Sequence, residues 1–179
     1  KKRILGLDNL TIADMYAPIC KCGALNKTFE EAYEIVLDAL SVLGEDYINV
    51  LKRAKDERWI DVFPSDNKQG GAFSVSSETG NPFVLLNYNK TYNDISTIAH
   101  ELGHAMHSYY SEHNQPHETC DYVIFVAEVA STVNEVLLCK YLIKNSKDNK
   151  LKKFLISSLL EDFYATVFRQ TMFSEFEEA

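Results

Sequence analysis

The stretch STIAHELGHAMHSYYSEH, residues 96–113, constrains the chain most strongly. It places His100, His104 and His107 on a few turns of one predicted helix, in a chain that has only five histidines. His100 and His104 are four residues apart, so their rings share one helix face and can bind a single metal ion. Glu101 lies beside the first of them, close enough to reach a water on that ion. This H-E-x-x-H pattern is typical of zinc held by two histidines, with the glutamate as general base.

A second predicted helix supplies candidates for a third ligand. In VIFVAEVASTVNEVLL, residues 123–138, nearly every position is apolar, which predicts a helix buried on most sides. The polar residues Glu128, Ser131, Thr132 and Glu135 fall at i, i+3, i+4 and i+7, so they form one continuous stripe. Buried carboxylates are costly unless they are paired or bind a metal. We therefore expect Glu128 or Glu135 to complete a catalytic site of three protein ligands and a water. The alternative is that both carboxylates pair with Lys or Arg.

The rest of the chain is predicted to be mainly helical, with one small β element. Short β-rich runs at 70–77 and 82–89 flank the turn residues Gly80 and Asn81, which indicates a hairpin or a pair of strands. Capping-box spacing marks the starts of two helices, with Thr28 and Glu31 in the first and Thr91 and Asp94 in the second. Helices are expected over residues 8–19, 28–44, 45–60, 91–113, 122–145 and 149–178.

Length and composition limit the class of protein. The 179 residues suffice for a single domain, residues 1–179, and both ends suggest a piece of a larger one. A net charge of -8 argues against a nucleic-acid partner, and no apolar run is long enough to span a membrane. We expect a cytoplasmic protein whose cysteines are reduced thiols; these are Cys20, Cys22, Cys120 and Cys139.

Several motifs together resemble one known family. IAHELGHAMHSYYS is followed by FVAEVASTVNEVLL, whose first glutamate comes 24 residues after His104. LGLDNLTIADMYAPI, RWIDVFPSDNKQGGAFS and PFVLLNYN match as well. The chain is similar over nearly its whole length to the oligoendopeptidase F branch of the thimet-oligopeptidase-like zinc peptidases. The resemblance implies a zincin-like, mainly helical fold with the strand pair beside the active-site helix.

The resemblance also implies roles for single residues. His100, His104 and Glu128 would bind one Zn²⁺ per chain, with Glu101 as the general base. Glu135 would orient a ligand histidine through its other ring nitrogen. His107 would either support the site or contact the substrate. The substrate would be an oligopeptide paired with the backbone of a strand. The residues offering that backbone would be Gly71, Ala72 and Phe73.

Two features of the family have no counterpart in this sequence. The family carries tyrosines and histidines for substrate and oxyanion binding in a later segment, and it has an additional N-terminal helical region. We therefore expect the 179-residue chain by itself to be weakly active or inactive. Two other functions remain open: a zinc amidase of another substrate class, and a metal-binding helical module without activity. The oligomeric state is left open as well.

Overall fold

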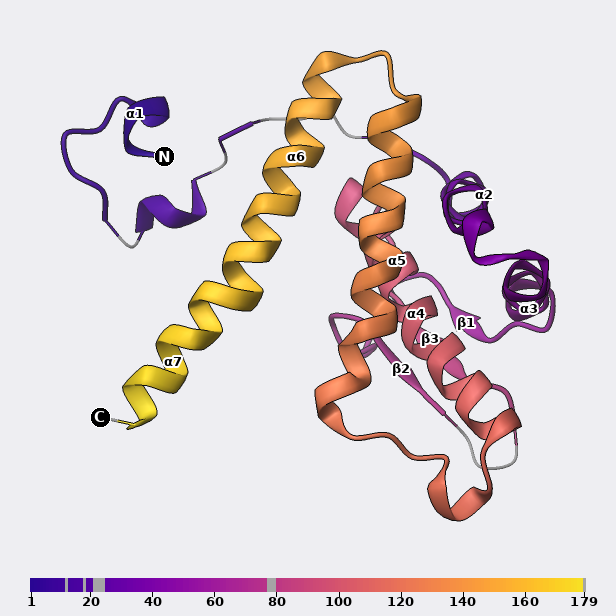
Figure 1. The fold of residues 1–179 in the computed structure, drawn as a ribbon. Coiled ribbons are helices and arrows are strands. Elements are labelled where there is room, and N and C mark those ends of the chain that lie inside the picture. The colour runs from indigo at the N-terminus through magenta and orange to yellow at the C-terminus, as the bar shows by residue number, and fades with distance from the viewer. Residues whose placement is uncertain (12, 18, 21–24, 77–79, 179) are drawn as a thin grey trace. The chain divides into compact units, whose positions relative to one another are not determined.

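The predicted architecture, mainly helical with a small β element, is confirmed (Figure 1). The computed structural model describes residues 1–11, 13–17, 19–20, 25–76 and 80–178. Its strands are β1 Ile60–Asp61, β2 Phe73–Val75 and β3 Phe83–Leu85. Its α-helices are α1 Lys2–Leu5, α2 Phe29–Leu40, α3 Glu45–Asp56, α4 Tyr92–Asn114, α5 Ile124–Asn145, α6 Asn149–Phe163 and α7 Arg169–Glu178.

The chain separates into two compact units. Residues 24–141 form one unit, with α2, α3, the sheet, α4 and most of α5; residues 1–23 and 142–179 form the other. The larger unit contains every residue for which the sequence predicts a functional role. Among the described residues, no helix combines the length and apolar character needed to cross a bilayer. The prediction of a single domain stays a prediction.

Helices α2 and α4 begin with the capping boxes that the sequence predicts. Thr28 accepts a hydrogen bond from the Glu31 backbone N–H, and the Glu31 side chain accepts one from the Thr28 N–H. Thr91 and Asp94 make the same reciprocal pair at the start of α4. Each box satisfies N–H groups that have no partner within the helix. The start of α4 is therefore fixed two turns before the first histidine.

The predicted strand pair is confirmed, although residues 77–79 of the segment that connects the two strands lie outside the described residues. β2 and β3 are antiparallel, with Ser74 opposite Val84. A third strand, β1, pairs in parallel with β3 and was not predicted from the sequence. It has two residues, too few for an alternating pattern to be recognised. The strand order β1-β3-β2 leaves β2 at one edge of the sheet.

The core of the larger unit lies between α2, α3, the sheet and α4. The Tyr33 hydroxyl donates to the Leu51 carbonyl at 2.7 Å, which joins α2 to α3 inside the core. Apolar side chains from all four parts are almost completely buried there: Val36, Leu40, Leu51, Val84, Ile95, Ile98, Leu102 and Met106. Burial of this apolar area is the main force that holds α4 in place.

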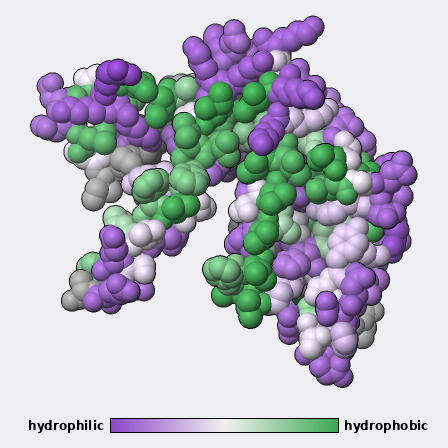
Figure 2. All heavy atoms as spheres, viewed as in Figure 1, coloured by the Kyte–Doolittle hydropathy of each residue, from purple (hydrophilic) through white to green (hydrophobic). Residues whose placement is uncertain are grey.

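The prediction that α5 is buried on most sides is wrong. Its buried residues are Ser131, Asn134, Leu138 and Cys139, whereas Phe125 is 89% exposed. Figure 2 shows the exposed apolar side chains as a green band along this helix. The reason is that the polar and small residues of α5, and not its valines, face α4. The contacts that impose this orientation belong to the candidate site.

Two smaller predictions also need correction. In the predicted helix at 8–19, the described part contains only a 3-10 helix, Ala13–Tyr16. The Asp14 carboxylate accepts hydrogen bonds from the Thr11 backbone N–H and hydroxyl, and such local bonds compete with an α-helix. The predicted helix at 149–178 is interrupted by a π-helical turn, Tyr164–Phe168. Among the described residues, Cys20, Cys120 and Cys139 take part in no disulfide, and Cys22 lies outside the described residues.

Candidate metal centre

The histidine pair of α4 converges as its spacing predicts. The Nε2 atoms of His100 and His104 lie 3.1 Å apart, and their ring centroids are separated by 4.8 Å. Both residues are half-buried on the helix face that is turned toward α5. Helix periodicity brings the two rings together, since residues four apart are neighbours on the helix surface.

Glu128 of α5 completes a triangle with the two histidines. Its Oε2 atom lies 3.4 Å from His100 Nε2 and 3.4 Å from His104 Nε2. These three residues form a group that could hold a metal ion. Ligand atoms bound at about 2.0–2.2 Å to one tetrahedral ion lie roughly 3.3–3.6 Å apart. The two separations from Glu128 fall within this range, and the two histidine nitrogens, 3.1 Å apart, lie slightly closer than it. The donor set, two imidazole nitrogens and a carboxylate oxygen, fits zinc.

A second carboxylate of α5, that of Glu135, contacts the ring nitrogen of His100 that faces away from the ligand triangle. Glu135 Oε2 lies 3.3 Å from His100 Nδ1, and the Ser96 hydroxyl donates to Glu135 Oε1 at 3.3 Å. The hydrogen bond with Glu135 is the largest cause of the raised pKa of His100. With its Nδ1–H donated to Glu135, the neutral imidazole of His100 has its lone pair on Nε2. That is the nitrogen which faces Glu128.

The close crossing of α4 and α5 depends on the absence of a side chain at Gly103. A Cβ atom added there would lie 2.5 Å from Ser131 Cα and 2.8 Å from Ser131 N. Those are backbone atoms, so no side-chain rotation could relieve the clash. Gly103 precedes His104 directly, and Ser131 follows Glu128 by one turn. This close contact between the two helices therefore lies beside the ligand triangle.

A buried asparagine joins α5 to the rest of the unit. Asn134 is 1% exposed, and its amide nitrogen donates to the Ala99 carbonyl at 3.1 Å and to the Tyr47 hydroxyl at 3.0 Å. Burial raises the pKa of Tyr47 to about 12, so this hydroxyl stays neutral at physiological pH. Because an unpaired buried amide is expensive, these bonds favour the observed rotation of α5.

Glu101 is buried next to the ligand triangle. It is 7% exposed, and burial raises the pKa of its carboxyl group. The charge of His100 acts against that rise, while those of Glu128 and Glu135 add to it. The pKa of His104 is lowered, mainly by burial. The α4 face thus combines a weakly solvated carboxylate with a histidine that favours its neutral, metal-binding form.

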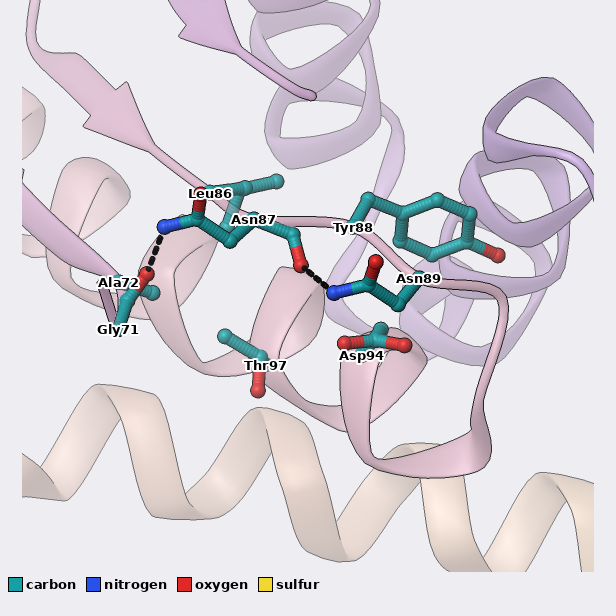
Figure 3. Close-up of a pocket in the computed structure, with 8 residues that line it drawn as sticks. All are labelled: Gly71, Ala72, Leu86, Asn87, Tyr88, Asn89, Asp94 and Thr97. Carbon is teal, nitrogen blue, oxygen red and sulfur yellow. Dashed lines mark hydrogen bonds between the residues drawn. The ribbon is translucent and has the colours of Figure 1, made fainter. Parts of the chain in front are cut away.

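The three residues predicted to bind substrate lie at the start of the edge strand. Gly71 has φ +88°, a backbone conformation that favours glycine, and it leads directly into β2. Figure 3 shows Gly71 and Ala72 across a pocket of about 300 Å³ from Asp94 and Thr97 of α4. Thr97 lies one turn before His100. Phe73 follows in β2 and is 40% exposed.

One asparagine supports the backbone on that side of the pocket. The amide nitrogen of Asn87 donates to the Gln69 carbonyl at 2.9 Å and to the Gly71 carbonyl at 2.8 Å. Figure 3 shows the bond to Gly71, and both bonds hold the loop that enters β2 against the segment that follows β3. The position of Gly71 relative to β3 is therefore fixed by side-chain hydrogen bonds as well as by strand pairing.

His107 lies in different surroundings from the other histidines of α4. Its ring stacks on Tyr122, with centroids 3.8 Å apart and planes 10° apart, and Tyr122 is hydrogen-bonded to Ser108. It also lines a mostly apolar pocket with valines of α5. Its Nδ1 atom is buried and has no hydrogen-bond partner among the described residues. A role for His107 at the metal site or on the substrate stays a prediction.

Some contributors to the site were missed by the sequence analysis. Ser96, Gly103, Asn87 and Asn134 carried no assigned role. An asparagine within an apolar helix is a recognisable signal, because a buried amide must find partners. Gly103 and Ser96 offered no such signal, since each acts through a residue distant in sequence.

Comparison with known proteins agrees with this geometry. Residues 7–179 match the model of peptidase family M3. The chain is 44% identical over 177 residues to oligopeptidase PepF of Bacillus subtilis, covering 99% of this chain and 26% of that protein. It is 42% identical over 179 residues to an oligoendopeptidase F homolog of Borreliella burgdorferi, with 99% and 30% covered.

A solved structure gives the same result. The crystal structure of a Chlamydophila abortus protein assigned as a peptidase superimposes with a TM-score of 0.89 at 40% identity, covering 99% of this chain and 30% of that one. The chain thus spans less than a third of the length of these relatives. With the family matched over nearly every residue, and with oligoendopeptidase F relatives at about this identity, the chain belongs to peptidase family M3.

Proposed function

We propose that this chain is the metal-binding part of a zinc-dependent peptidase that hydrolyses oligopeptides. The observation that carries the proposal is the triangle of His100, His104 and Glu128, with buried Glu101 beside it. The relatives support the substrate class, because they are named as oligopeptidases and oligoendopeptidases. One Zn²⁺ per chain would be held by the three ligands. A cytoplasmic location, expected from the sequence, stays a prediction.

Glu101 would carry the proton transfer. When bound, zinc would polarise the scissile carbonyl and lower the pKa of a water toward about 7. The Glu101 carboxylate would accept the proton of the attacking water and return it to the leaving amine. Burial raises the pKa of Glu101 and so brings its proton affinity closer to those of the water and the amine between which it would move the proton. Glu135 would keep His100 in the orientation that the site requires.

The substrate would lie along the edge strand. β2 has β3 on one side, and the sheet order leaves its other side free of a strand partner among the described residues. A peptide added there would exchange backbone hydrogen bonds with Gly71, Ala72 and Phe73. The pocket between Gly71 and Thr97 adjoins the α4 turn that leads to His100, so a peptide on this edge would approach the ligand triangle.

Metal content and peptide cleavage together test this proposal. The purified complete protein, of which these 179 residues are a part, should contain about one zinc per chain and cleave a quenched oligopeptide. A chelator should remove the activity, and added zinc should restore it. Retention of activity after complete removal of metal would contradict the proposal. A protein that cleaves non-peptide amides and leaves peptides intact would show that the substrate class is wrong.

A further inference from the structure

We propose that the Ser131 hydroxyl positions the Glu128 carboxylate and thereby sets the affinity and geometry of the metal site; this inference rests on the proposed function. The Ser131 hydroxyl donates to Glu128 Oε2 at 2.8 Å. That same oxygen lies 3.4 Å from both histidine Nε2 atoms. The hydrogen bond is therefore made to the atom that points into the ligand triangle.

Glu128 needs such support because its side chain is long and largely solvent-exposed. Its side chain is 59% exposed, in contrast to 27% for His100 and 18% for His104. A glutamate loses much of its side-chain rotamer entropy when it is fixed in one conformation. Among the described residues, Ser131 supplies the one hydroxyl that is bonded to this carboxylate. Without it, the carboxylate would have to be ordered by the metal alone.

Ser131 is closely packed on all sides, so its hydroxyl has a defined position from which to orient the Glu128 carboxylate. It is fully buried, and its backbone lies against Gly103 at the crossing of α4 and α5. The same hydroxyl proton is shared with the Glu128 carbonyl, whose oxygen lies 3.0 Å from the Ser131 Oγ atom. Ser131 thus connects the third ligand to the helix that bears the first two. The position of the Glu128 carboxylate therefore depends on the distance between the two helices at Ser131.

The neighbouring residue provides a matched control. The Thr132 hydroxyl donates to the Glu128 carbonyl at 2.6 Å, but it makes no hydrogen bond to the carboxylate. Both residues therefore bond to the backbone of Glu128, while only Ser131 also bonds to its side chain. Removing each hydroxyl separates an effect on the helix from an effect on the ligand.

The test compares Ser131→Ala and Thr132→Ala in the complete protein. Zinc affinity is measured by competition with a chelator, and visible absorption is recorded after Co²⁺ substitution, because the spectrum reports ligand geometry. We expect Ser131→Ala to weaken zinc binding by about tenfold, the usual cost of losing a group that orients a ligand. Its Co²⁺ spectrum should change. Thr132→Ala should leave affinity and spectrum unchanged, and circular dichroism should show both variants folded.

Three results would overturn the proposed role of Ser131, and they differ in what they say about the metal site. Equal affinity and an unchanged Co²⁺ spectrum in Ser131→Ala would overturn the role of Ser131 while leaving the metal site intact. Equal losses in both variants would also overturn it, because the cause would then be the helix. A wild-type protein that binds no zinc would overturn the proposed function and, with it, this inference.

Discussion

Helices α4 and α5 supply the two halves of the candidate metal centre, yet they differ in the side chains that they bury. α4 buries mainly apolar residues such as Ile98, Leu102 and Met106, each 1% exposed. α5 buries the polar Ser131 and Asn134 together with Leu138 and Cys139, while Phe125 and Val129 are exposed. The first helix is held mainly by the hydrophobic effect, whereas beside the ligands the second is oriented by hydrogen bonds and by a close backbone contact.

This difference has a consequence for the site. Two ligands and the proposed base sit on a helix whose position is supported by a large apolar core. The third ligand sits on a helix whose rotation depends on a few polar groups and on Gly103. Substitutions of the buried apolar residues of α4 should therefore affect mainly overall stability, whereas substitutions of the buried polar groups of α5 should act mainly on metal binding.

The largest effect is expected at Glu101, on α4. Glu101→Gln keeps the size of the side chain but removes its ability to accept a proton. Activity in the complete protein should fall by about two to four decades, the usual range for loss of a general base, while zinc content stays the same. Turnover of a quenched peptide and metal analysis check this. Activity within a few-fold of wild type would remove Glu101 from the mechanism.

The next effect compares apolar residues on the two helices. Leu102→Ala opens a cavity beneath α4 and should cost about 2–5 kcal/mol of unfolding free energy. The matched change on α5, Val133→Ala, removes a side chain that is already 45% exposed and should cost far less. Urea denaturation of both variants measures the difference. Similar costs would mean that the outer face of α5 is packed in solution.

A third substitution acts on the crossing itself. Gly103→Ala places a methyl group against the backbone of Ser131, and the helices must separate to accommodate it. Overpacking of this kind costs about 1–3 kcal/mol. Because the crossing lies beside the ligand triangle, zinc affinity should fall together with stability. A variant with normal thermal stability and normal zinc affinity would show that the helices do not approach so closely.

The sequence predicted those features that local patterns encode. The two capping boxes, the strand pair and the convergence of His100 with His104 all depend on residues close together in the chain. The stripe that begins at Glu128 was also visible, because polar residues interrupt an apolar helix. The sequence could not show which face of α5 packs on α4, since its valines suggested burial. The contact at Gly103 and the strand β1 exist only through partners distant in sequence.

A smaller effect is expected at Glu135, which supports His100 and does not face the triangle. Glu135→Ala should lower zinc affinity by about 10–100-fold, the range found when a group that orients a ligand is removed. Glu128→Ala should cost more, because it deletes a ligand. Chelator competition compares the two variants directly. If Glu135→Ala abolished binding and Glu128→Ala left it unchanged, the assignment of the third ligand would be wrong.

The smallest effect is expected on the outer face of α5, and it tests the comparison most directly. Val129 is 57% exposed, and Thr has nearly the same shape and the same branching at Cβ. Val129→Thr therefore changes polarity at this position without a large change in helix propensity. If α5 is oriented only by its polar face, unfolding free energy should change by no more than about 0.5 kcal/mol in the 179-residue chain, as for other exposed sites.

Zinc affinity of the Val129→Thr variant should stay the same, since the side chain of Val129 makes no hydrogen bond to any of the three ligands. Denaturation and chelator competition measure both quantities. A loss of 1 kcal/mol or more, as expected for a buried valine, would show that the apolar face of α5 also contributes to its position.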